Sequence, residues 1–268
     1  MTAKSALALA AQRAASAGRR AFPPAVYAGA RRALRATLSR LCAGNLDLLA
    51  VLHGSDKWGT HHWYTPHYAR HFGPLRRRRL KILEIGVGGY ADPRAGGGSL
   101  RMWKYYFPRS EIYAIDLHDK SPLEEPRIRI FRGSQNDPGF LRAVARDMGR
   151  LDIVIDDGSH VNEHVLTSFR TLFPLLEPHG LYVVEDTQTS YWPAFGGDSY
   201  DLGNPATMMA ALKSLADSLN YQEIARRDYA PSYLDRHVVG LHFYHNLVFI
   251  QKGDNREPGD GFVAQHLY

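Results

Sequence analysis

The chain has 268 residues, of which 44% are hydrophobic and 22% are charged. These values are typical of one large globular domain and exclude a disordered, collagenous or membrane-spanning chain. Cys42 is the only cysteine of the sequence, which excludes an intramolecular disulfide and a cysteine-based metal site. We therefore expect a reducing compartment, the cytoplasm.

Positive charge is concentrated at the N-terminal end. The net charge is +6, but residues 1–46 hold eight basic residues and no acidic one, which leaves a net of −2 for residues 47–268. The basic pI therefore does not indicate a nucleic-acid partner for the main part of the chain. No run approaches 18 apolar residues, so no membrane span is expected.

The first fifty residues are rich in Ala and Arg and predict two helices, separated at Phe22-Pro23-Pro24. We expect residues 1–50 to form a basic helical arm and residues 51–268 to form the main domain. The arm is either a solvated pair of helices or a surface that contacts an acidic partner, a lid or a neighbouring subunit. The last alternative would make the protein a homo-oligomer.

From Leu80 onward, short apolar runs alternate with helical patterns. Strands are predicted at residues 80–85, 111–116, 128–131, 151–155 and 181–185, and helices at residues 99–107, 138–148, 163–176 and 204–219. Asn204 is the expected N-cap of the last helix. The alternation predicts an α/β fold with a doubly wound, mainly parallel sheet. The apolar residues 237–251, interrupted near His245-Asn246, are expected to close the sheet with antiparallel strands.

The first predicted strand runs into a glycine-rich loop, in which glycines allow a sharp turn and close approach to a ligand. Gly86, Gly88 and Ala91 fit the dinucleotide fingerprint. Glu84, two residues before the first glycine, instead fits motif I of S-adenosylmethionine (SAM) methyltransferases. Asp116, at the end of the second strand, could accept both ribose hydroxyls of either cofactor. The loop alone predicts an adenosine cofactor or, alternatively, a tight turn without a ligand.

Two acidic pairs follow the fourth and fifth strands: Asp156-Asp157, with His160 shortly after, and Glu185-Asp186. Both pairs should meet at the carboxyl edge of the sheet, where ligands bind. Close carboxylates need a compensating cation, and oxygen ligands favour Mg²⁺, Mn²⁺ or Ca²⁺. Methyl transfer to a sugar hydroxyl would use such a metal together with a histidine base, whereas hydride transfer has no need of it. Helix capping by Asp157, a structural Asp156 and a surface His160 are the alternatives.

Several motifs, taken in order, make the chain resemble the SAM- and Mg²⁺-dependent O-methyltransferases that modify sugars on macrolides and other actinobacterial glycosides, of the mycinamicin and tylosin type. The motifs are SDKWG (55–59), LEIGVGGY (83–90), GGGSLRMWKYYFP (96–108), DIVIDDGSH (152–160), VVEDTQTSYWP (183–193) and LHFYHNLVF (241–249). The resemblance covers about residues 50–252. It implies the Rossmann-like, seven-stranded sheet of class I methyltransferases, here preceded by the helical arm.

The resemblance also implies cofactors and roles. SAM and Mg²⁺ would be the cofactors, with the metal held by Asp157, Glu185 and Asp186 and with His160 as the general base. The implied cofactor-binding residues are Glu84, Gly86, Gly88, Ser99, Asp116, Gln135 and Asp156, with Tyr64 and the Asp56-Lys57 region over the cofactor or the cleft.

The acceptor implied by the resemblance is a carbohydrate or glycoside: a glycosylated natural product or a methylated mannose polysaccharide. The macrolide enzymes carry an N-terminal domain that is longer than the positively charged segment of about fifty residues that precedes the match here. Two other functions remain as alternatives, namely an NAD-type oxidoreductase and a non-catalytic adenosine-binding module that docks through its basic arm.

Overall fold

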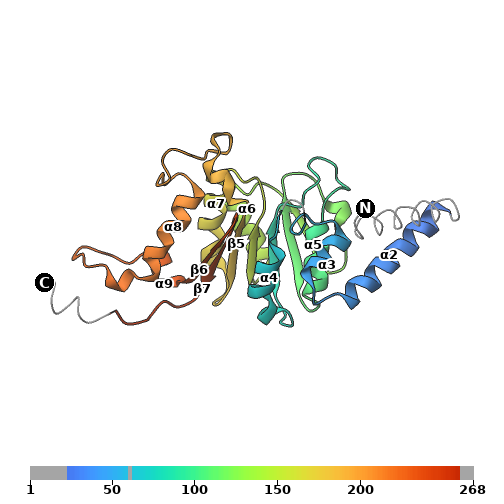
Figure 1. The fold of residues 1–268 in the computed structure, drawn as a ribbon, viewed down its shortest axis with the longest axis horizontal. Helices are drawn as coiled ribbons and strands as arrows, with labels where there is room; N and C mark the ends of the chain where they lie inside the picture. Colours follow the sequence, from blue (N-terminus) through green and yellow to red (C-terminus); the bar gives the residue numbers. More distant parts are fainter. Residues whose placement is uncertain (1–22, 60–61, 260–268) are drawn as a thin grey trace, which may run out of the picture.

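A seven-stranded sheet forms the centre of the molecule (Figure 1) in the computed structural model, which describes residues 23–59 and 62–259. Its strands are β1 (Lys81–Ile85), β2 (Glu111–Asp116), β3 (Ile128–Arg132), β4 (Ile153–Asp156), β5 (Leu181–Glu185), β6 (Val238–Tyr244) and β7 (Leu247–Lys252). The spatial order is β3-β2-β1-β4-β5-β7-β6. The first five strands pair in parallel, and β7 pairs antiparallel with both β5 and β6. The predicted doubly wound sheet and its closing antiparallel strands are confirmed.

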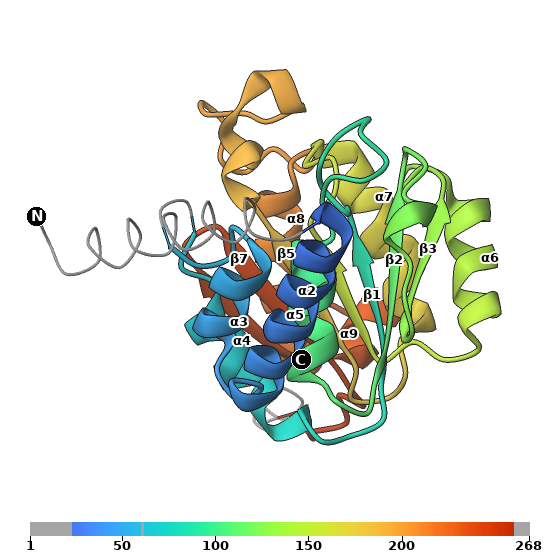
Figure 2. The ribbon, with the colours of Figure 1, turned by 90° about the vertical axis from the view of Figure 1, so that its right-hand side faces the viewer.

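Helices cover both faces of the sheet (Figure 2). They are α2 (Pro24–Leu41), α3 (Leu46–His53), α4 (Thr65–Phe72), α5 (Gly98–Tyr106), α6 (Pro138–Met148), α7 (Asn162–Leu172), α8 (Met208–Leu219) and α9 (Tyr233–His237). Successive side chains of a strand point to opposite faces, so each strand contributes to two cores. Ile82 packs in the core beneath α3, α4 and α5, whereas Leu83 packs in the core beneath α6, α7 and α8.

The helix predicted over residues 204–219 begins later than expected. Its first residue is Met208, and the N-cap is Thr207, whose side chain accepts a hydrogen bond from the backbone N–H of Ala210. The predicted cap, Asn204, is wrong: its Oδ1 accepts from the N–H of Ala206 in a local turn. Asn side chains favour such turns as readily as caps, so the residue type alone did not decide between them.

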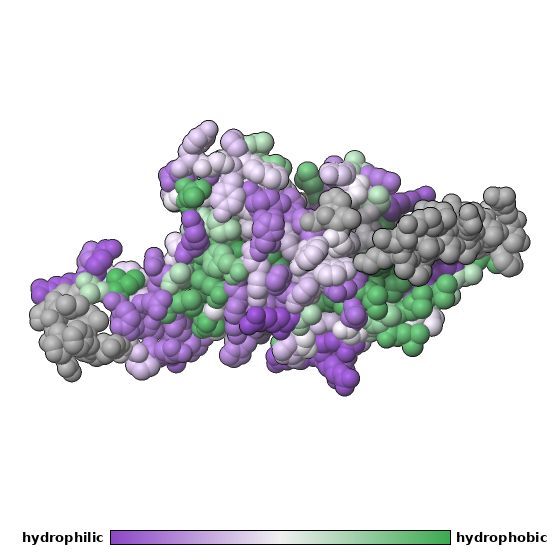
Figure 3. All heavy atoms as spheres, in the orientation of Figure 1, coloured by the Kyte–Doolittle hydropathy of each residue, from purple (hydrophilic) through white to green (hydrophobic). Residues whose placement is uncertain are grey.

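Helix α2 begins at Pro24, which agrees with the predicted break, and the first helix of the predicted arm lies outside the described residues. The second predicted helix is divided in two, because α2 ends at Leu41 and α3 begins at Leu46 after the cap Asn45. Exposed apolar side chains gather on α2 and α3, including Leu34, Leu41 and Val51, in the region that Figure 3 shows as a hydrophobic surface. Helix α3 crosses the boundary expected between residues 50 and 51. The division into arm and main domain therefore stays a prediction, as does self-association. Within the described ranges, no helix is long and apolar enough to cross a bilayer.

His53 links α3 to the rest of this layer. Its Nε2 lies 2.9 Å from Oγ of the buried Ser39 on α2, and its ring stacks on Tyr105 at 5.3 Å between centroids. Burial, aided by the positive charge of Arg35, lowers the pKa of His53 from 6.5 to about 4. The folded protein therefore holds this imidazole in its neutral form at pH values where the unfolded chain already binds a proton.

We expect His53→Phe to flatten the pH dependence of stability. The stability linked to neutral His53 is complete above the unfolded pKa of 6.5 and is lost as the pH falls toward about 4. Phenylalanine keeps a stacking ring but cannot titrate. Thermal unfolding followed by circular dichroism should show a smaller fall of Tm from about pH 7 to about pH 4.5 for the variant than for the native sequence. Parallel curves for the two proteins would contradict this assignment.

Candidate active site

The loop after β1 folds tightly across the carboxyl ends of the neighbouring strands. Gly86 has a φ of 97°, and a Cβ at this position would lie 2.0 Å from the carbonyl oxygen of Asp157. Gly88 also has a positive φ, 75°. Asp116 Oδ2 accepts a hydrogen bond from the backbone N–H of Val87 at 3.1 Å, which fixes the loop to the end of β2. Gly86, Gly88 and Asp116 thus share one edge of the sheet, as a cofactor loop requires.

Glu84 and Ser99 are also brought together. The Ser99 hydroxyl, near the start of α5, donates to Glu84 Oε2 at 3.0 Å, and Glu84 Oε1 lies 3.3 Å from Nζ of Lys57. The carboxylate is completely buried, and burial raises its pKa to about 7 although Lys57 opposes the shift. All of these partners are protein groups, so the cofactor contacts of Glu84 and Ser99 stay predictions.

The side chain of Asp156 lies on the face of the sheet that α7 covers. Its Oδ1 accepts from Gln135 Nε2 at 3.1 Å, and its Oδ2 accepts from the hydroxyls of Ser168 on α7 and Tyr182 on β5. Gln135 Oε1 in turn accepts from the backbone N–H of Ser159 at 2.7 Å. Burial raises the pKa of Asp156 to about 6. These bonds favour the structural alternative for Asp156, and the cofactor contacts of Asp156 and Gln135 stay predictions.

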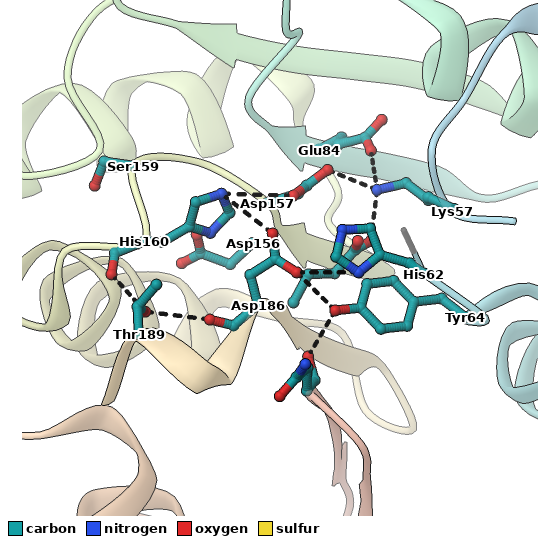
Figure 4. Close-up of polar contacts among 12 residues, drawn as sticks. Lys57, His62, Tyr64, Glu84, Asp156, Asp157, Ser159, His160, Asp186 and Thr189 are labelled. Atoms are coloured by element: carbon teal, nitrogen blue, oxygen red, sulfur yellow. Dashed lines mark hydrogen bonds and ion pairs between the residues drawn. The ribbon is translucent and has the colours of Figure 1, made fainter. Parts of the chain in front are cut away.

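Asp157, His160 and Asp186 form a group at the cleft edge (Figure 4). His160 Nε2 lies 3.9 Å from Asp157 Oδ1 and 3.6 Å from Asp186 Oδ2. One ligand atom from each of the three residues lies within 4.8 Å of the others, which is close enough to share a metal ion. The structure thus brings together the predicted base and two of the three predicted metal ligands.

Two residues of this group have unusual backbone conformations. His160 has a φ of 56° and Asp186 a φ of 52°. Positive φ is uncommon outside glycine and clusters at functional sites. The hydroxyl of Thr189 lies 2.8 Å from the carbonyl oxygen of His160 and 3.1 Å from that of Asp186, and so ties the two turns together. Sequence reasoning missed Thr189; its signal was its place in the motif that follows Glu185.

Glu185 occupies a deeper position than Asp186. Its Oε1 accepts hydrogen bonds from Lys57 Nζ at 2.6 Å and from the Tyr68 hydroxyl at 2.5 Å. It belongs to a second group of carboxylates with Glu84 and Asp157. The predicted metal ligands are therefore distributed over two groups that share Asp157, and the full ligand set stays a prediction.

The resemblance implies that the Asp56-Lys57 region lies over the cofactor or the cleft, but it gives Lys57 no role. Its side chain is completely buried, and it also donates to Asp157 Oδ2 at 2.6 Å. Burial by itself would lower the pKa of Lys57, but Asp157, Glu185 and Glu84 outweigh it and hold the pKa well above its ordinary value. The lysine is therefore a permanent cation in the site.

In each of the two carboxylates at the cleft edge, one oxygen accepts a hydrogen bond from a neighbouring side chain. Lys57 binds Oδ2 of Asp157, and the Tyr64 hydroxyl binds Oδ1 of Asp186 at 2.6 Å. The oxygens near His160 are then Oδ1 of Asp157 and Oδ2 of Asp186. Donors behind the ligands orient them in metal sites, and hard oxygen ligands suit Mg²⁺. The residues present thus fit a divalent cation. Tyr64 lies beside this candidate metal position, because its hydroxyl bonds to Asp186.

Comparison with known proteins gives a consistent result. No protein-family model matches the chain. It is 55% identical over 216 residues to demethylmacrocin O-methyltransferase of Streptomyces fradiae and 51% identical over 216 residues to mycinamicin VI 2''-O-methyltransferase of Micromonospora griseorubida. These matches cover 80% of this chain but 55% and 54% of those relatives, so the chain spans about half of their length.

A solved structure of MycE methyltransferase from the mycinamycin biosynthetic pathway, in complex with Mg and SAH, superposes with a TM-score of 0.79 at 51% identity. The superposition covers 81% of this chain and 55% of the MycE chain. The chain has the class I methyltransferase fold, as predicted. The predicted resemblance is also confirmed: over about four fifths of its length the chain is similar to these two O-methyltransferases and to MycE methyltransferase.

We expect Tyr64→Phe to weaken Mn²⁺ binding by about ten- to a hundredfold, because Asp186 loses the donor that orients it. Titration followed by the electron paramagnetic resonance of free Mn²⁺ measures this affinity. Tyr113→Phe is the matched control, since the Tyr113 hydroxyl donates to Glu111 Oε2 at 2.6 Å at the other edge of the sheet. Equal affinities for Tyr64→Phe and the control would contradict the orienting role.

Proposed function

We propose that the chain carries the active site of an enzyme that transfers a methyl group from SAM to a sugar hydroxyl with the help of Mg²⁺. The observation that carries this proposal is the imidazole of His160 beside Asp157 and Asp186, next to the glycine loop. The acceptor would be the sugar of a glycosylated natural product. The names of the relatives support it, as does a solved MycE complex with Mg, SAH and mycinamycin VI.

Each residue has a role in this reaction. Bound Mg²⁺ would supply a Lewis acid that lowers the pKa of the acceptor hydroxyl. Asp157, Glu185 and Asp186 would hold that ion. His160 Nε2 would take the hydroxyl proton, and Thr189 keeps the His160 turn in place. The glycine loop and Asp116 would hold SAM so that its methyl group faces the acceptor oxygen, and this positioning supplies much of the acceleration.

A pocket of about 480 Å³ beside Asp186 suits the acceptor. It is lined by His62, Trp63, Tyr64, His67 and His245. Ring-lined concave sites with a few polar groups are typical of small-molecule binding, and flat rings can stack on the apolar face of a sugar. The pocket meets the metal side of the site because the Tyr64 hydroxyl reaches Asp186.

The alternatives are less well supported. An NAD-type oxidoreductase and a non-catalytic adenosine-binding module would both leave the carboxylate–histidine group without a purpose. The named relatives are O-methyltransferases, and they are about half identical to this chain.

We expect His160→Ala to lower kcat for methyl transfer by about a hundredfold or more, because the general base is lost. Transfer of labelled methyl from SAM to a deoxyhexosyl macrolide measures the rate, and EDTA should abolish it. His164→Ala is the control, since His164 bonds the Ser159 hydroxyl instead of the carboxylates. Calorimetry should show that S-adenosylhomocysteine binds to all three proteins and that NAD⁺ does not. Full activity of His160→Ala, or binding of NAD⁺ alone, would overturn the assignment.

We expect Trp63→Ala to raise KM for the glycoside by roughly three- to tenfold, the equivalent of a lost ring contact, with unchanged affinity for S-adenosylhomocysteine. Trp63 is 69% exposed, so its replacement should not disturb the core. Tyr200→Ala removes another exposed ring outside the pocket and serves as the control. Equal KM values for the native protein and Trp63→Ala would contradict the assignment of this pocket to the acceptor.

A further inference from the structure

Lys57 lies at the centre of three carboxylates in the inner half of the acidic site (Figure 4). Its Nζ is 2.6 Å from Asp157 Oδ2, 2.6 Å from Glu185 Oε1 and 3.3 Å from Glu84 Oε1. The ammonium group donates hydrogen bonds to Asp157 and Glu185 and forms an ion pair with Glu84. The side chains of Lys57 and Glu84 are completely buried, and that of Glu185 is 2% exposed.

The same three carboxylates have the geometry of a divalent-cation site. One oxygen from each of Glu84, Asp157 and Glu185 lies within 4.8 Å of the others. Glu84 Oε1 is buried and has no hydrogen-bond partner, so the ion pair with Lys57 is its compensation. Buried carboxylates without a cation would repel one another strongly. A positive charge among these carboxylates therefore stabilises the inner group.

The backbone holds Lys57 firmly in this position. Its carbonyl oxygen accepts hydrogen bonds from the N–H groups of Tyr64, at 3.0 Å, and Thr65, at 3.3 Å, where α4 begins. Tyr68, one turn further along α4, donates its hydroxyl to the same Glu185 oxygen that Lys57 binds. The ammonium group is thus supplied by a residue whose backbone is hydrogen-bonded to the start of α4.

We propose that Lys57 fills the space among Glu84, Asp157 and Glu185, keeps Glu84 from binding the metal, and thereby confines the divalent cation to the outer side of Asp157 and Glu185, with Asp186 and beside His160. The proposal rests on the proposed function, which assigns a metal to that outer position. Asp157 belongs to both groups, and Lys57 takes its Oδ2 while Oδ1 is the oxygen nearer to His160. Lys57 is therefore a positioning residue, because a metal drawn into the inner group would move away from the base and the acceptor pocket.

The test is a double-mutant cycle on Mn²⁺ affinity without SAM, with Lys57→Ala and Glu84→Gln as the two changes. With Lys57 present, the ion lies outside the inner group and the loss of the Glu84 charge has a small effect. With Lys57→Ala, the ion can enter the inner group and use Glu84 as a ligand. We expect the weakening caused by Glu84→Gln to be at least about tenfold larger in the Lys57→Ala background, since ligand charge count sets the affinity of such sites.

Lys252→Ala is the matched control, because Lys252 is also a buried lysine but donates to the carbonyl oxygens of Pro174 and Leu176 at the opposite edge of the sheet. It should leave the effect of Glu84→Gln unchanged. An equal effect of Glu84→Gln with and without Lys57 would show that Lys57 does not exclude the metal and would overturn the proposal.

A second measurement needs no variant of Lys57. Crystals of the native protein grown with Mn²⁺ should show the anomalous signal beside His160, with Lys57 Nζ still between Glu84 and Glu185. An ion bound to Glu84 in place of Lys57 Nζ would overturn the proposal. Failure of the native protein to bind Mn²⁺ at all would instead contradict the metal-dependent function on which the proposal rests, so the two failures are distinguishable.

Discussion

The buried charge of Lys57 is the interaction on which the rest of the site depends. Strands β1, β4 and β5 are neighbours in a parallel sheet, so their carboxyl ends bring Glu84, Asp157 and Glu185 to one place. Glu84 and Glu185 are buried and Asp157 is partly buried, so the three carboxylates would destabilise the folded state unless a cation lies among them. The cation comes from outside the sheet, from the segment between α3 and α4. That connecting segment is therefore part of the active site.

Strand alternation explains why adjacent acidic residues have different surroundings. Along β4, Ile153 and Ile155 pack beneath α3, α4 and α5, and Asp157 continues on that side toward the cleft. Val154 faces the other helices, and Asp156 follows it into bonds with α7 and β5. Period-two side-chain direction thus separates the two members of the pair. The alternation of side-chain direction along β4, continued by one residue past its end, predicts this difference between Asp156 and Asp157.

The limits of sequence reasoning are visible at particular residues. The strand and helix pattern predicted the sheet because the apolar periods are strong, and the acidic pairs indicated the cleft because strand ends collect there. The start of α8 was misplaced because Asn204 and Thr207 are both good caps, and tertiary contacts chose between them. No role was predicted for Thr189 or for Lys57, which was placed only over the cofactor or the cleft. Thr189 acts through the backbone carbonyl of His160, and Lys57 acts through carboxylates that are distant in sequence.

By itself the sequence determined the fold class, the glycine loop and the set of carboxylates with its histidine, because these follow from local periodicity and from short motifs. Only the tertiary structure decided which carboxylate oxygens are already bound, that Tyr64 holds Asp186, and that Lys57 lies inside the acidic group. The physical reason is that these contacts join residues as far as 128 positions apart in the chain. Their distances are set by the packing of α3 and α4 on the sheet, which no local pattern encodes.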